Sequence, residues 1–255
     1  MSEKNKNYWI PFVIVSYLGL SYLPIFGWWI SILGTGLILL FGYFAWPLSF
    51  KERLGIPSKF SQYLITFFLL IIFAIASYIL MSLIQKQNDL GFGIGYIQNF
   101  THIFFYTLNE ELILGGLIIL FLKKRYKNLN PIIISVGVAS IFSIIHYIFY
   151  RWIFQGPAQG ILSFAVLISL LIIGIVRNNF IIRTNHIGYA WALHFSWMAI
   201  MFGCSYYRPS NSEQLSQIER FNIFIGNRYT IVSGFIFALI TSVWLYFHNK
   251  RVAVN

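Results

Sequence analysis

The chain has 255 residues, of which 58% are hydrophobic, 20% aromatic and 10% charged, and its formal net charge is +11. A soluble domain carries roughly a quarter charged residues, so this composition excludes an ordinary water-soluble protein and indicates a chain solvated by lipid. A charge of +11 would suit nucleic acid if it formed a soluble basic patch. Here the cations are spread between long apolar runs, and we expect no nucleic-acid partner.

Eight apolar segments are long enough, or nearly so, to cross a bilayer as helices, which takes about 20 residues. In chain order they are Tyr8–Leu23, Trp28–Trp46, Phe60–Ile84, Ile97–Leu122, Pro131–Tyr150, Ala158–Val176, Ile187–Gly203 and Tyr229–Phe247. Backbone polar groups in lipid must be satisfied within each segment, which favours helices over an open sheet. The sequence therefore predicts an all-α, polytopic membrane helix bundle of about eight transmembrane helices, with residues 1–255 forming a single transmembrane domain.

The first segment follows a positive N-terminus and could be mistaken for a signal peptide. No small-x-small cleavage site follows it, and a second apolar run begins almost at once. We interpret it as a retained span.

The longest hydrophilic segment runs from Arg208 to Arg228, RPSNSEQLSQIERFNIFIGNR. It could be a short amphipathic piece at the membrane interface, started by Pro209 and Ser210. Its polar composition favours a plain loop instead, and a loop is our prediction.

The cations are distributed unequally between the two sides of the predicted bundle. One side carries 13 of the 18 Lys and Arg residues: Lys4, Lys6, Lys51, Arg53, Lys59, Lys123, Lys124, Arg125, Lys127, Arg177, Arg183, Lys250 and Arg251. The positive-inside rule places this side, and both termini, in the cytoplasm. The cations would also face the anionic lipid headgroups of that leaflet.

Two of the seven acids, Glu110 and Glu111, lie near the middle of the fourth segment in YTLNEELILGG. An ionisable group at that depth costs at least about 2.5–3.5 kcal/mol, which makes both acids candidates for function. Adjacent helical residues point about 100° apart, so both can border one pocket in different roles. A structural alternative is that they are protonated carboxyls that only tie helices together.

Two histidines lie at a depth similar to that of the acids, in other segments. Counted from the cytoplasmic cations at about 1.5 Å per residue, Glu110 lies about 20 Å deep, His146 about 22 Å and His194 about 16 Å. We therefore expect three helices to bring these side chains together in one polar pocket. For His102 we expect a mainly structural role, and for His186 and His248 an interfacial one.

One carboxylate and two imidazoles suit hydrolysis. The carboxylate can deprotonate a water, one histidine can share that proton, and the other can stabilise an oxyanion. Ser143 could touch His146, but no strained turn presents it as a nucleophile. A glutamate and two histidines could also bind zinc. Because the chain has no HExxH motif, we favour water activated by glutamate and expect no metal and no cofactor.

The acids lie in a motif that resembles the first motif of a known family. EELILGG is similar to the EExxxR motif, usually continued by glycine, of the CPBP (CAAX protease and bacteriocin-processing, or Abi) intramembrane glutamate-type endopeptidases. Glu110, Glu111 and Gly116 match, and Gly115 stands where the family has arginine.

The histidines extend the resemblance. The family's FxxxH motif is matched by Phe142 and His146. Its third motif, a histidine followed four residues later by asparagine, is matched at His194, with Met198 in place of the asparagine. The three motifs occur in the family's order, and the resemblance covers about residues 50–200.

The resemblance implies a role for each residue. Glu110 with His146 would activate the water, His194 would help to form the oxyanion site, and Glu111 would orient the pair. The substrate would be a peptide or a membrane-protein tail. We expect a multi-pass protein of a bacterial cell membrane.

The two departures from the motifs bear on activity. Gly115 removes the expected charge partner of the acids, which favours their protonation. Met198 removes a neutral oxyanion donor, a group worth about 3 kcal/mol in other enzymes. Arg151 and Asn109 are the candidate replacements.

Two other classes of function remain open. A catalytically inactive member of the family could act as a membrane scaffold, a regulator or a bacteriocin-immunity protein, as the lost arginine and asparagine suggest. A proton-coupled transporter could use the acids and histidines as a relay, although the sequence lacks a visible two-fold repeat.

Overall fold

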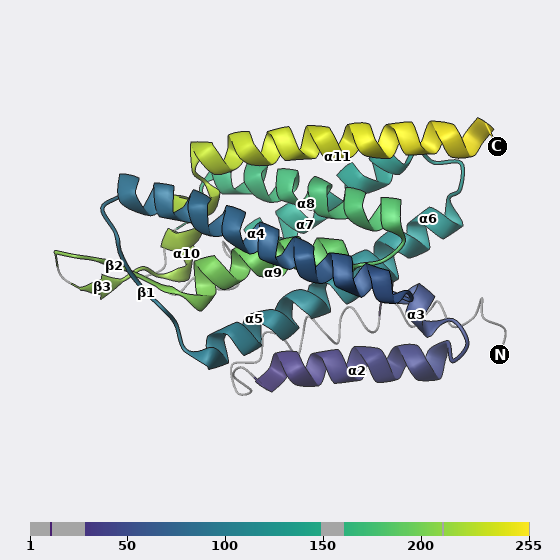
Figure 1. Ribbon diagram of the computed structural model, residues 1–255, viewed down its shortest axis with the longest axis horizontal. Helices are drawn as coiled ribbons and strands as arrows, with labels where there is room; N and C mark the ends of the chain where they lie inside the picture. The colour runs from purple at the N-terminus through teal and green to yellow at the C-terminus, as the bar shows by residue number, and fades with distance from the viewer. Residues whose placement is uncertain (1–10, 12–28, 149–160, 211, 255) are drawn as a thin grey trace.

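The computed structural model describes residue 11 and residues 29–148, 161–210 and 212–254. Apart from residue 11, the first predicted segment, Tyr8–Leu23, lies outside these residues. The described chain is a bundle of helices with a small sheet at one end (Figure 1).

Most of the long helices begin and end close to the predicted boundaries. All the described helices, short ones included, are α2 (Trp29–Ala45), α3 (Phe50–Arg53), α4 (Phe60–Gln87), α5 (Ile97–Glu110), the π-helix η3 (Glu111–Leu120), α6 (Phe121–Arg125), α7 (Pro131–Ile148), α8 (Phe164–Thr184), α9 (Gly188–Met198), the π-helix η5 (Ala199–Gly203), α10 (Gln217–Arg220), the π-helix η6 (Phe221–Ile225) and α11 (Arg228–Val254). The segments α5, η3 and α6 follow one another without a break.

Among the described residues, five helical segments are long and apolar enough to cross a membrane: Phe60–Gln87, Ile97–Arg125, Pro131–Ile148, Phe164–Thr184 and Arg228–Phe247. The predicted all-α membrane bundle is thus confirmed, and the chain is a membrane-embedded protein. The helix α2, with 17 residues, and the helix α9, with 11, are shorter. The expected number of eight spans stays a prediction.

The helix α8 is the centre of the bundle. It packs against α7, α9 and α11, and Figure 1 shows it running beneath α11. In the most apolar stretch of α8, 67% is buried inside the bundle, whereas in that of α4 17% is buried. The apolar side chains of α4 therefore form an outer face suited to lipid, and α8 carries its side chains into the interior.

Buried polar side chains join the helices. Asn109 on α5 donates from Nδ2 to the carbonyl oxygen of Ser31 (2.8 Å) and accepts at Oδ1 from the hydroxyl of Thr35 on α2 (2.6 Å). Asn179 on α8 similarly links Ser135 of α7 to Thr241 of α11. Such interhelical bonds replace the hydrophobic driving force that lipid does not supply.

The position of α8 differs from the prediction in a way that affects the site. The predicted segment, Ala158–Val176, ended where the apolar run meets Arg177. The helix instead begins after Ser163, whose hydroxyl accepts the N–H of Val166, and ends at Asn185, which has a left-handed conformation (φ 59°). These are common helix-capping residues. Arg177 is therefore inside the helix and is not a loop cation.

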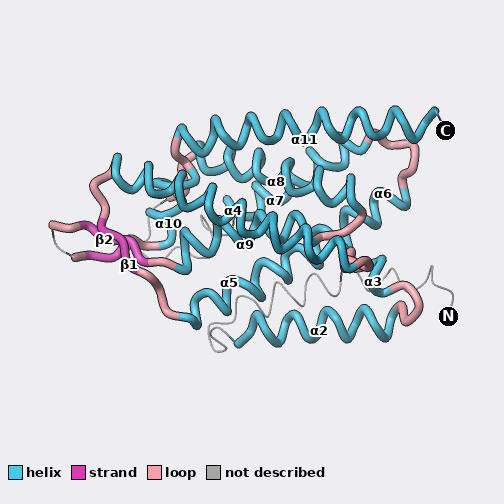
Figure 2. The backbone as a smooth tube through the Cα atoms, in the orientation of Figure 1, coloured by secondary structure: helices cyan, strands magenta, loops and turns pink. Residues whose placement is uncertain are grey.

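A three-stranded antiparallel sheet lies at the end of the bundle opposite α3 and α6 (Figure 2). It consists of β1 (Gly91–Gly93), β2 (Ser205–Arg208) and β3 (Glu213–Gln214), with Gly91 opposite Tyr207. A Cβ atom on Gly91 would overlap the Tyr207 ring, so a larger residue at this position would have to displace that ring.

The prediction of a plain loop from Arg208 to Arg228 is wrong. The segment contains β3, α10 and η6. Ile218, Phe221 and Phe224 are at most 3% exposed, so the burial of apolar side chains within a mostly polar segment orders it.

Candidate active site

The two acids lie at a junction between two kinds of helix. Glu110 is the last residue of α5, and Glu111 is the first residue of the π-helix η3. A π-helix bonds residue i to i+5 and is frequently found at functional sites. Glu111 is fully buried and Glu110 is 9% exposed.

Glu110 has polar groups on both carboxylate oxygens. The hydroxyl of Tyr106, one turn earlier on α5, donates to Oε1 (2.8 Å). Nε2 of His146 lies 4.0 Å from Oε1, and Nε2 of His194 lies 3.5 Å from Oε2. The helices α5, α7 and α9 thus bring together the three side chains that the sequence placed at similar depth.

The ring of His146 is oriented by its own helix. Nδ1 lies 2.9 Å from the carbonyl oxygen of Phe142. Because a carbonyl only accepts hydrogen bonds, Nδ1 must carry the proton. In the neutral ring this leaves the lone pair on Nε2, the atom that faces Glu110.

His194 lies between the two acids. Its Nδ1 is 3.0 Å from Oε1 of Glu111, while its Nε2 faces Glu110. The ring is 4% exposed and stacks on Trp197 with an angle of 19° between the planes. These contacts restrict both the position and the orientation of the imidazole.

Arg177 is a member of this cluster that the sequence analysis missed. Its Nε lies 3.5 Å from Oε1 of Glu111, and its guanidinium lies 4.4 Å from the centre of the Phe142 ring. Arg177 is 2% exposed. The prediction that Arg177 is a cytoplasmic loop cation is wrong, because α8 continues beyond it. The helix-capping residues Ser163 and Asn185 could have indicated the true ends of this helix in the sequence.

The two departures from the family motifs have different structural settings. A Cβ atom on Gly115 would lie 3.5 Å from Oε2 of Glu111, but also 2.8 Å from Cδ1 of Ile181 and 3.0 Å from Cγ2 of Ile187. Apolar side chains therefore fill the space around Gly115. Met198 is 9% exposed and belongs to the apolar cluster that includes Phe142 and Trp197.

One of the two candidate replacements, Asn109, lies in the described part of the chain, and it does not donate to the acids. The side-chain amide of Asn109 bonds to α2, as described above, and the expectation that it serves the acids is wrong for this reason. Arg151 lies outside the described residues.

Other polar side chains near the motifs have partners elsewhere. The hydroxyl of Ser143 donates to the carbonyl oxygen of Leu167 (2.7 Å), which does not suit a nucleophile paired with His146. His102 is hydrogen-bonded to the hydroxyl of Ser31 (3.0 Å), a contact between α5 and α2. The side chain of His248 lies outside the described part of the chain.

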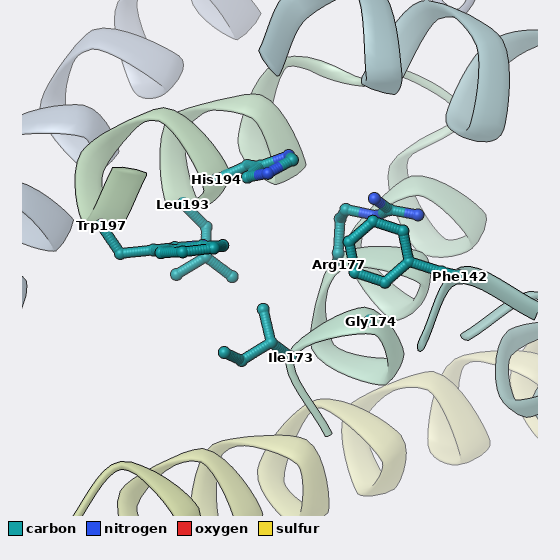
Figure 3. A pocket seen from close by; sticks show the side chains of 7 residues that line it. All are labelled: Phe142, Ile173, Gly174, Arg177, Leu193, His194 and Trp197. Atoms are coloured by element: carbon teal, nitrogen blue, oxygen red, sulfur yellow. The ribbon is translucent and has the colours of Figure 1, made fainter. Parts of the chain in front are cut away.

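A small cavity lies beside the cluster, between α7, α8 and α9 (Figure 3). It is lined by Phe142, Ile173, Gly174, Arg177, Leu193, His194 and Trp197. Its volume, as the space open to the centre of a water molecule, is about 10 Å³, close to the minimum for one water. Of the acids and histidines, His194 lines it. Glu110, His146 and His194 meet beside this cavity, with Nε2 of each histidine within 4.0 Å of a carboxylate oxygen of Glu110.

Within the described residues, no group of three or more His, Cys, Asp or Glu side chains has the arrangement of a metal site. Comparisons with known protein families, with curated proteins and with solved structures found no match for this chain.

Proposed function

We propose that the chain is an intramembrane endopeptidase that hydrolyses a peptide bond with a glutamate-activated water, as a divergent CPBP-type protease. The observation that carries this proposal is one cluster made by Glu110, Glu111, His146 and His194 inside the bundle. Four ionisable groups at membrane depth are costly to maintain for stability alone.

Glu110 and His146 are the pair that activates the water. Their facing atoms are 4.0 Å apart, whereas a water hydrogen-bonded to both needs a separation of roughly 4.5–5.5 Å. A displacement of about 1 Å, well within side-chain motion, would admit it. Glu110 then removes a proton from the water, and Nε2 of His146 accepts and passes on that proton.

His194 supplies the donor for the tetrahedral intermediate. A proton on Nε2 would let the ring donate to the oxyanion while Nδ1 stays bonded to Glu111. Glu110 and Glu111 carry two negative charges against the one positive charge of Arg177, so an imidazolium at His194 makes the cluster neutral. Glu111 thus acts as the residue that holds the ring in place.

A second candidate function is supported by the burial of the cluster and by the two departures from the motifs. Glu110 is 9% exposed and His194 is 4% exposed, and Gly115 and Met198 stand where the family has arginine and asparagine. An inactive relative that acts as a membrane scaffold, a regulator or a bacteriocin-immunity protein needs neither access for a substrate nor those two side chains.

We also propose a multi-pass arrangement in a bacterial cell membrane with both termini in the cytoplasm. Lys124 on α6 pairs with Glu52 on α3 (3.3 Å), and Lys123 donates to Asn185 at the end of α8 (2.7 Å). These contacts gather cations at one end of the bundle, as the positive-inside rule requires of the cytoplasmic side.

The experiment is a cleavage assay with the purified full chain in liposomes. The probe is a mixed-sequence library of quenched fluorescent peptides, with and without a C-terminal prenyl group. We expect cleavage by wild type and its loss, by at least about a hundredfold, in Glu110→Gln and His146→Ala. Glu52→Gln, an exposed acid on α3, is the matched control and should cleave normally. Equal product from wild type and Glu110→Gln would exclude the protease and favour the inactive relative.

A further inference from the structure

Arg177 is a buried cation in the cluster of acids and histidines to which neither the sequence motifs nor the proposed reaction gives a role. We propose that Arg177 is a positioning residue whose charge keeps Glu111 ionised and thereby fixes the ring of His194. This inference deepens the proposed function and rests on it.

Burial requires an anion beside Arg177. Arg177 is 2% exposed and Glu111 is fully buried. Arginine does not lose its proton in proteins, so its charge in the bundle interior needs a nearby anion. The ion-pair distance of 3.5 Å from its Nε to Oε1 identifies Glu111 as that anion.

The contact between Arg177 and Glu111 is not an ordinary hydrogen-bonded ion pair. Within the described residues, Nε and Nη1 of Arg177 and Oε2 of Glu111 have no hydrogen-bond partner. An arginine kept only for stability would be expected to have its buried N–H groups bonded. Its Nη2 donates weakly to Oδ1 of the neighbouring Asn178 (3.5 Å), and the guanidinium lies over the face of the Phe142 ring, 4.4 Å from its centre. The interaction with Glu111 is therefore mainly one of charge.

The charge of Glu111 in turn determines the protonation of His194. An ionised Glu111 only accepts hydrogen bonds, so Nδ1 of His194 must carry a proton, and the imidazolium proposed above carries its second proton on Nε2. A protonated Glu111 would instead donate to Nδ1 and leave a neutral ring. The charge on Glu111 thus decides whether His194 is held as an imidazolium or as a neutral ring.

Among the described residues, the charged and titratable groups around Glu111 come from four positions. Arg177 comes from α8, His194 from α9 and Glu110 from the neighbouring position, with His146 of α7 on the far side of Glu110. Arg177 is the permanent cation within this described set, and without it two adjacent like charges would favour proton uptake.

The direct test is infrared difference spectroscopy on the full chain in liposomes at neutral pH, which needs no substrate. The spectrum of wild type minus Glu111→Gln is expected to show an ionised carboxylate. Arg177→Met, which keeps an unbranched stem but removes the charged guanidinium, is expected to show a protonated carboxyl that disappears in the double variant with Glu111→Gln. Arg177→Lys should restore the ionised band.

The kinetic test uses the same variants with the peptide library. In Arg177→Met the acid limb of the pH–activity profile should move to higher pH by about 1–3 units, and Arg177→Lys should move it most of the way back. The matched control is Arg183→Met. This residue is an arginine six positions later on α8 that stacks on Trp244 (4.9 Å), and its loss should leave the profile unchanged.

Either of two spectroscopic results would overturn the proposal. One is a protonated Glu111 in wild type, which can be read even if Arg177→Met does not fold. The other is an ionised Glu111 in folded Arg177→Met. A wild type that cleaves no peptide would refute the proposed function alone, because the infrared result still decides the role of Arg177.

Discussion

The two histidines of the site are oriented in the same way but have opposite roles. In each ring Nδ1 is bonded to a fixed oxygen, from Phe142 for His146 and from Glu111 for His194. Nε2 of each ring is therefore directed to Glu110, from two different helices. The difference between the oxygens, a neutral carbonyl and a carboxylate, suits one histidine to accept a proton and the other to hold one.

The hydrogen bond from Tyr106 to Glu110 is expected to contribute to activity. Its hydroxyl donates to Oε1 (2.8 Å), and Tyr106→Phe removes that bond while keeping the ring. We expect kcat/KM on the peptide library to fall by about tenfold, or about 1.4 kcal/mol of transition-state stabilisation. Tyr63→Phe, which loses a hydroxyl bonded to the carbonyl of Pro57, is the control. An unchanged kcat/KM in Tyr106→Phe would show that the bond does not matter.

His186 gives a prediction for the pH dependence of stability. It lies between α8 and α9, is 3% exposed, and accepts the N–H of Gly188 at Nδ1 (3.2 Å). Burial lowers the pKa of His186 from 6.5 to about 4. Between these values the unfolded chain binds a proton that the folded protein does not bind. Stability should therefore fall as the pH drops from about 6.5 to about 4, by at most about 1.4 kcal/mol per pH unit.

The measurement is the melting temperature in detergent between pH 7 and pH 4 for wild type and His186→Gln. On acidification the melting temperature of wild type should fall further than that of His186→Gln, because the variant lacks the titrating group. Parallel curves would show that His186 does not control this dependence.

Among the elements, α8 shows what sequence reasoning can and cannot find. Hydropathy located the helix but ended it at Arg177, because a charge in an apolar run is indistinguishable from the start of a loop. The capping residues at Ser163 and Asn185 were local signals that could have corrected the boundaries. The pairing of Arg177 with Glu111 joins residues 66 positions apart, and no local pattern contains it.

The acids and histidines were easier to find than the elements around them. Glu110, His146 and His194 stand out because ionisable side chains are rare in apolar segments. The π-helix η3 and the pairing of β1 with β2 depend on contacts with distant segments, such as the close approach of Gly91 to Tyr207, and a reading of one segment at a time misses them.

The π-helix η3 is expected to depend on a glycine. A Cβ atom on Gly116 would lie 2.4 Å from the carbonyl oxygen of Leu54, just after α3, and that backbone cannot rotate away as a side chain can. Gly116→Ala should lower the free energy of unfolding by about 1–3 kcal/mol through overpacking.

The matched control is Gly137→Ala on α7, where a Cβ atom would meet nothing within 4 Å. Alanine is the better helix former, by up to about 1 kcal/mol, so this variant should unfold at the same temperature as wild type or higher. Thermal unfolding in detergent measures both. A Gly116→Ala protein as stable as the Gly137→Ala protein would contradict the close packing of η3.

As a whole, the molecule is a bundle with two unlike ends. Cations of α3, α6 and the end of α8 gather at one end, and the three-stranded sheet with α10 covers the other (Figure 1). The cluster of acids and histidines lies between them, inside helices whose outer faces are apolar.

This arrangement predicts the result of cysteine labelling on intact cells. Gln87, near the sheet, and Lys127, after α6, are both exposed. Each is replaced by cysteine in a Cys204→Ala background and treated with a membrane-impermeant maleimide. We expect Gln87→Cys to react on intact cells, and Lys127→Cys only after permeabilisation, because the cationic end should face the cytoplasm. The reverse pattern would invert the proposed topology.

The most direct test of the proposed hydrolysis is cleavage of the peptide library in water enriched in ¹⁸O, with the products analysed by mass spectrometry. If Glu110 activates a water, each new C-terminal carboxylate formed by wild type carries one ¹⁸O atom, and Glu110→Gln forms no such product. Products without the label, or equal amounts of labelled product from wild type and Glu110→Gln, would contradict the account.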